Sequence, residues 1–144
     1  MFDALEISAS GLTAERLRMD VTAQNLANAQ TTRGADGQPY RRKEVVLAER
    51  QAGGGFGAAL QGAMSGGSPG GVEVAAIAED QTPLKQVYDP SHPDADANGY
   101  VQMPNVDTVA EMVDLISAQR AYEANVTAMQ AAKQMFSKTL ELLR

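Results

Sequence analysis

The sequence predicts a mainly α protein, in which long N- and C-terminal helices form an inner coiled-coil domain with a small irregular β and loop insertion between them. Apolar residues recur at spacings of three and four near both ends of the 144-residue chain. All six prolines and every glycine except Gly11 lie between residues 30 and 105, which excludes long helices there. The expected organisation is therefore a helical segment 1–32, an insertion 33–105 and a helical segment 106–144.

An amphipathic helix is predicted from Phe2 to about Asn28. The apolar row along it comprises Phe2, Leu5, Ala9, Leu12, Met19, Ala23 and Leu26, with Arg16 as the one polar member. Gly11 costs about 1 kcal/mol relative to Ala inside a helix, but its missing side chain leaves room for a neighbouring helix. Asn25, Asn28 and Thr31 are predicted to cap the end of this helix, and simple turn propensity explains them equally well.

Short strands are predicted in the insertion at residues 40–47, 71–78 and 84–88, where β-branched and aromatic residues gather. Between the first two lies the low-complexity run AGGGFGAALQGAMSGGSPGG, which is predicted to be mobile and whose role stays open. Asn98-Gly99 predicts a turn with positive φ. The basic run Arg41-Arg42-Lys43, which is followed by acidic residues, is interpreted as a solvated strand end.

The C-terminal helix is predicted from Val106 to about Leu143. Asn105 or Thr108 can cap its start, the latter with Glu111 in a capping box. A coiled-coil seam is predicted from a heptad series, which runs Met112, Leu115, Gln119, Tyr122, Val126, Met129, Lys133, Phe136, Leu140, Leu143. Because no third long helix completes a bundle, we expect other chains to cover what the N-terminal helix leaves open.

Composition argues against several function classes. The net charge of −6 and the pI near 4.7 disfavour nucleic acid or an anionic membrane as partner. No stretch approaches the roughly 18 apolar residues that span a bilayer, and no cleaved secretion signal is expected. The lone His92 has no thiol partner, and neither a G-x-S-x-G nor a G-K-[ST] motif occurs. We therefore predict no enzyme activity, cofactor or metal.

Residues 89–99 carry the one alternative from a different class. His92-Pro93-Asp94 matches the tripeptide of J-domain co-chaperones, and Asp94, Asp96, Asn98 and Gly99 match the first half of an EF-hand loop. However, Pro90 and Pro93 forbid the first helix of the co-chaperone hairpin. No helix is predicted before the EF-hand-like loop, and Asn105 stands where calcium needs a Glu. A calcium-binding or chaperone-adaptor module therefore remains the weaker reading.

Two terminal segments resemble the flagellar axial family of rod, hook and hook-associated proteins. The first is SASGLTAERLRMDVTAQNLANAQTT, and the second is EMVDLISAQRAYEANVTAM, in which QRAYEAN at 119–125 is the most diagnostic stretch. The central run VYDPSHPDADANGYVQMPNVDTVAEMVDL resembles the proximal-rod members of that family. Another rod protein of the same family, differing in the central segment, is the main rival reading.

The resemblance implies a structural subunit of the basal-body proximal rod that self-assembles and transmits motor torque through packed helices. It also implies export through the flagellar type III apparatus without a cleaved signal, and a periplasmic location. Expected partners are other copies of the chain and neighbouring rod proteins such as FlgB, FliE and FlgF. The residues that we assign to the assembly interface are Leu5, Leu12, Met19, Asn25, Leu26, Asn28, Thr31, Met112, Leu115, Gln119, Arg120, Tyr122, Glu123, Asn125, Val126, Met129, Phe136 and Leu140.

Within that set, two pairs of polar residues have a more specific expectation. Gln119 and Lys133 interrupt the apolar seam and could set its register, as single polar core positions do in coiled coils. Arg120 and Glu123 could form ion pairs between chains, although a solvated helix face explains them as simply.

Overall fold

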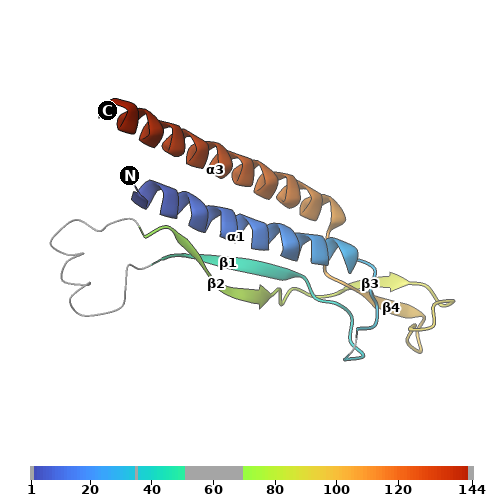
Figure 1. The fold of residues 1–144 in the computed structure, drawn as a ribbon. Coiled ribbons are helices and arrows are strands. Elements are labelled where there is room, and N and C mark those ends of the chain that lie inside the picture. Colours follow the sequence, from blue (N-terminus) through green and yellow to red (C-terminus); the bar gives the residue numbers. More distant parts are fainter. Residues whose placement is uncertain (1, 35, 51–69, 143–144) are drawn as a thin grey trace, which may run out of the picture. The chain divides into compact units, whose positions relative to one another are not determined.

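The computed structural model describes residues 2–34, 36–50 and 70–142 (Figure 1). The elements in chain order are α1 (Phe2–Ala27), β1 (Lys43–Glu49), β2 (Val72–Glu79), β3 (Lys85–Tyr88), β4 (Tyr100–Met103) and α3 (Thr108–Leu142). The strands form two two-stranded sheets, β1 with β2 and β3 with β4. Two helices with a β insertion between them are therefore confirmed. The Gly-rich run that is predicted to be mobile lies outside the described residues, apart from Gly70 and Gly71.

The chain divides into two compact units. The terminal unit consists of Met1–Arg16, Val46–Ala76 and Gln119–Arg144, and the central unit of Leu17–Val45 and Ile77–Ala118. Across the described residues, the buried apolar side chains are mostly small: Ala14, Val21, Val101, Val106, Ala118 and Ala132. Each unit therefore has a thin core, as expected from a chain with few aromatic residues.

Close approach of the helices in the terminal unit depends on Gly11. A Cβ atom at this position would lie 3.0 Å from Nδ2 of Asn125 on α3. The prediction that Gly11 admits a neighbouring helix is confirmed, and that helix belongs to the same chain. In the same unit the Val72 N–H donates to Oγ of Ser10 over 3.0 Å, which ties the start of β2 to α1.

The start of α3 corrects the predicted cap. The helix begins at Thr108, so Asp107 occupies the N-cap position, and its Oδ1 accepts the N–H of Val109 at 3.0 Å. Neither Asn105 nor a Thr108–Glu111 capping box does this. The physical reason is that an Asp at the N-cap satisfies the free N–H groups directly, while Glu111 is engaged by other partners, described below.

The end of α1 agrees in part with the prediction. The Asn28 Nδ2 donates to the Gln24 carbonyl at 2.9 Å, and the Thr31 Oγ1 donates to Asn28 Oδ1 at 3.2 Å. Asn28 therefore caps the helix and Thr31 holds the Asn28 side chain, whereas Asn25 does not act as a cap, because its amide binds Tyr40, Lys43 and Glu111. The expected left-handed conformation of Asn is not used, because glycines alone among the described residues have positive φ.

The β3–β4 hairpin belongs to the central unit. Its strands are antiparallel, with Tyr88 opposite Tyr100 and Val87 opposite Val101. The sequence did not predict β4, because four residues between a turn and Pro104 are too short a pattern to separate from loop. The predicted turn is present, and Gly99 rather than Asn98 adopts the positive φ, at 82°.

A positive φ alone costs an L-residue roughly 1–2 kcal/mol. We expect Gly99→Ala to lower the free energy of unfolding by more than this. A Cβ at Gly99 would also lie 3.0 Å from the Tyr88 ring and 3.2 Å from Pro90. Gly37→Ala is the matched control, because Gly37 has φ of 74° but no atom within 4 Å of an added Cβ. Urea unfolding of the full chain measures both. Equal losses in the two variants would contradict the crowding at Gly99.

Candidate functional site

A polar cluster in the central unit, here called the polar junction, comprises the buried Asn25 and Glu111 and the half-buried Tyr40, Arg42 and Asn105. Asn25 and Glu111 are each only 1% exposed. The Asn25 Nδ2 donates to the Lys43 carbonyl at 2.8 Å and to Glu111 Oε2 at 3.0 Å. Its Oδ1 accepts from the Tyr40 hydroxyl and from the Lys43 N–H, both at 2.9 Å. The Asn25 amide thus uses all four of its hydrogen-bonding positions, which joins α1 to the start of β1 and to α3.

Glu111 and Arg42 form the charged part of the polar junction. Arg42 Nε donates to Glu111 Oε1 at 2.5 Å, and its remaining nitrogens contact Glu44, Asp80 and Asp114. Burial lowers the pKa of the Arg42 guanidinium, but hydrogen bonds to Glu111 and Glu44 outweigh this, so the pKa lies above its ordinary value. The interpretation of Arg42 as part of a solvated strand end was wrong, because four carboxylates surround its guanidinium and replace water.

The other two members complete the polar junction. Burial, with smaller contributions from Glu111 and Glu79, raises the pKa of Tyr40 above 10.0, so its hydroxyl keeps its proton at neutral pH. Oδ1 of Asn105 accepts the Arg42 N–H at 2.9 Å, and its Nδ2 donates to Thr82 Oγ1 at 2.8 Å. Asn105 therefore holds the chain before α3 against the start of β1, instead of capping the helix.

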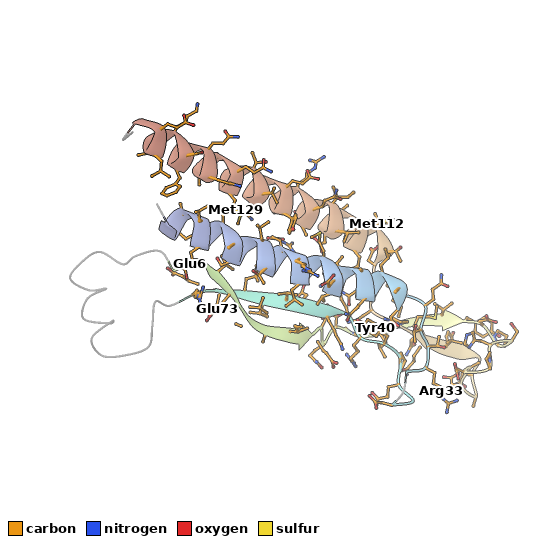
Figure 2. The ribbon with its side chains drawn as sticks, in the orientation of Figure 1. Glu6, Arg33, Tyr40, Glu73, Met112 and Met129 are labelled. Atoms are coloured by element: carbon orange, nitrogen blue, oxygen red, sulfur yellow. The ribbon has the colours of Figure 1, made fainter. Side chains whose placement is uncertain are left out.

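Large apolar side chains lie exposed on α3 in the same unit. Spaced by three, four and seven residues, they form one stripe, here called the α3 stripe: Val109, Met112, Val113 and Ile116. Val113 is 61% exposed and Ile116 is 52% exposed. Figure 2 labels Met112 of this stripe, and Tyr40 of the polar junction. In the terminal unit, Met135, Phe136 and Leu140 of α3 are also exposed.

The residues that α3 turns inward differ from the predicted seam. Glu111 and Ala118 are buried in the central unit, and Ala132 is buried in the terminal unit, where Asn125 contacts Gly11. The inward positions 111, 118, 125 and 132 each lie one residue before the predicted seam positions 112, 119, 126 and 133. The other predicted seam positions, Leu115, Tyr122 and Met129, lie on the same side as this inward row. Because α1 approaches α3 closely at Gly11, the fully buried positions of this row carry small or polar side chains, whereas Leu115, Tyr122 and Met129 are only half-buried.

The predicted interface residues fall into three groups by burial. Asn25 is buried. The half-buried ones are Leu5, Leu12, Met19, Leu26, Asn28, Thr31, Leu115, Tyr122, Asn125, Val126 and Met129. The exposed ones are Met112, Gln119, Arg120, Glu123, Phe136 and Leu140. The Gln119 Nε2 donates to Glu123 Oε1 at 3.3 Å, so each of these two side chains has a partner within α3.

Residues 89–99 use their polar groups internally. Oδ1 of Asp96 accepts the N–H groups of Asn98 and Tyr100, and Asp94 accepts the Thr32 hydroxyl at 2.9 Å. These carboxylates shape a turn. Over residues 2–34, 36–50 and 70–142, no group of three His, Cys, Asp or Glu side chains is arranged to hold a metal ion. Within that same part of the chain, neither helix has a window apolar enough for a membrane span.

Known proteins match the chain at both ends and along its full length. Residues 5–35 match the family described as flagella basal body rod protein, and residues 97–142 match the one described as flagellar basal body rod FlgEFG protein C-terminal. The flagellar basal-body rod protein FlgC of Bacillus subtilis is 54% identical over 98% of this chain and 97% of its own length. FlgC of Borreliella burgdorferi is 45% identical over 100% of this chain and 98% of its own length. FlgC of Salmonella typhimurium is 46% identical over 99% of this chain and 97% of its own length.

Proposed function

This chain belongs to the FlgC family of flagellar basal-body rod proteins and is a structural subunit of the basal-body rod, and we propose that it assembles through exposed apolar faces of its helices. The α3 stripe carries the proposal. Four large apolar side chains are exposed together on one helix face, and covering them with another chain lowers the free energy by removing apolar surface from water. The relatives are named as rod proteins and not as enzymes, which fits a protein without catalysis.

The interface that we propose combines the α3 stripe with the half-buried and exposed interface residues from the sequence. Neighbouring helices pack against these rows as in a coiled coil, and torque passes through that packing. The neighbours are other copies of the chain and adjacent rod proteins such as FlgB, FliE and FlgF, in the periplasm. Export through the flagellar type III apparatus agrees with the thin cores, because a weakly stabilised fold is easily unfolded for passage.

The polar junction has a supporting role in this proposal. The Asn25 and Glu111 side chains fix the end of α1 beside the start of α3, and Arg18 adds a 4.0 Å contact to Asp114. Because the α3 stripe begins at Val109, close to Glu111, this anchoring holds the stripe in a defined orientation within the central unit.

A cysteine-accessibility experiment tests the interface. The chain contains no Cys, so Met112→Cys introduces a single thiol at an exposed position of the α3 stripe. We expect the thiol to react with a maleimide at least about tenfold more slowly in purified basal bodies than in the purified subunit, because neighbours cover it. Gln81→Cys, at an exposed position between β2 and β3, is the control and should change less than about twofold. Equal reactivity of Met112→Cys in both states would refute the proposed interface.

A further inference from the structure

The β3–β4 hairpin presents an outward face that the proposed helix packing does not use. Because Tyr88 pairs with Tyr100 and Gln86 with Gln102, these four side chains share one face. Val101, on the opposite face, is buried, whereas Tyr88 is 64% exposed and Tyr100 is 45% exposed. The two rings lie edge to face with centroids 5.3 Å apart. Exposed tyrosines of this kind are enriched in protein interfaces, where they give large contact area at low entropy cost.

A cavity of about 370 Å³ adjoins this face within the central unit. The hairpin, the loop after α1 and the loop 89–99 line it, and the side chains that matter here are Arg33, Gln86, Asp94, Asp96, Tyr100 and Gln102. Arg33, which Figure 2 labels, lies 3.7 Å from the Asp94 carboxylate. The lining therefore holds two carboxylates, which also accept hydrogen bonds from Thr32 and within the loop, and one cation, Arg33, which pairs with Asp94 and is 71% exposed.

The charge of the central unit indicates what approaches this face. Its segments contain eleven acidic and six basic residues, a net charge of −5 out of −6 for the whole chain. Two copies of the chain would meet here with like charge, which disfavours a second copy as the occupant. A cationic side chain is attracted instead. An arginine fits best, because its planar guanidinium stacks on tyrosine rings and donates several hydrogen bonds to carboxylate and amide oxygens.

We propose that the Tyr88–Tyr100 face and its cavity receive an exposed arginine or lysine side chain from a rod subunit other than a second copy of this chain. The inference rests on the proposed function, since the rod supplies the neighbour. It gives the central unit a second docking face, which selects the neighbour by charge, whereas the apolar α3 stripe provides contact area with little selectivity.

Photo-cross-linking in purified basal bodies tests this docking face. A benzophenone amino acid replaces Tyr88 in the full chain, or Gln102 on the same face if the Tyr88 variant is not incorporated, and mass spectrometry maps the product. We expect a cross-link to a segment of another rod protein that contains Arg or Lys. A product with a second copy, a lipid or a glycan, or no product from an incorporated chain, would overturn the docking face and leave the proposed function standing. Absence of the parent chain, which carries no benzophenone, from the same purified basal bodies would instead overturn the proposed function.

A matched charge pair sharpens the test. Gln86 lines the cavity and its side chain makes no hydrogen bond within the described residues, so Gln86→Lys and Gln86→Glu change the charge without removing a bond of the fold. We expect Gln86→Lys to lower the cross-link yield about tenfold, because the added ammonium repels the incoming cation. Gln86→Glu should keep the yield or raise it. Equal yields from both variants would exclude charge selection at this face.

Discussion

Asn25→Asp should destabilise the protein by about 3 kcal/mol or more at neutral pH, although the two side chains have nearly the same shape. The substitution replaces the Nδ2 donor by a carboxylate oxygen, which then faces Glu111 Oε2 and the Lys43 carbonyl at the distances of the former hydrogen bonds, 3.0 and 2.8 Å. Two carboxylates in a site only 1% exposed cannot both stay charged without a large cost. Urea unfolding of the subunit, followed by circular dichroism, measures the loss.

The pH dependence of this variant provides an internal check. The neighbouring Glu111 should raise the pKa of the introduced carboxyl in the folded state above about 3.9, its value in an unfolded chain. The protonated carboxyl regains a donor, so the deficit against the parent protein should be small below that pH and should grow as the pH rises through the folded pKa. Asn28→Asp is the control, because Asn28 makes one donor contact at the half-buried end of α1 and should cost about 1 kcal/mol. Equal losses at the two positions would contradict the special role of Asn25.

Hydrogen bonds over long separations explain why the sequence did not predict the polar junction. The bond from Asn25 to Glu111 joins residues 86 apart, and that from Arg42 to Glu111 joins residues 69 apart. Locally, Thr108 and Glu111 have capping-box spacing, and Arg42 lies in a basic run beside acids, so local chemistry favoured a cap and a solvated strand end. Asn25 was selected as an interface residue from the family resemblance, but nothing local indicates that it is buried.

The helices themselves were predictable because their signals are local. Continuous apolar periodicity over 26 and 35 residues gave bounds within two residues of those observed for α1 and α3. Which face turns inward was not predictable to the same degree. Apolar side chains occupy more than one face of α3, and the period alone does not say which one its own chain covers. Close helix approach at Gly11 decides it, by favouring small residues inside.

Val113→Asp should abolish rod assembly and swimming while leaving the free energy of unfolding of the subunit unchanged within about 0.5 kcal/mol. The Val113 side chain is 61% exposed on the α3 stripe, so an aspartate there is solvated in the free subunit. In an apolar interface the same carboxylate loses its water without gaining a partner, at a cost of about 3 kcal/mol, or more than a hundredfold in association. Swimming assays and the protein content of isolated basal bodies measure the effect.

Ala110→Asp separates the α3 stripe from a general intolerance of charge on α3. Ala110 is exposed in the same helical turn but is not part of the stripe, and an acidic residue near a helix N-terminus is stabilising. This variant should assemble and swim. The proposal requires that Val113→Asp does not assemble, although it unfolds at the same urea concentration as the parent protein. If it swims normally, the apolar stripe is simply solvated in the rod, and neighbouring subunits must contact other faces of the chain.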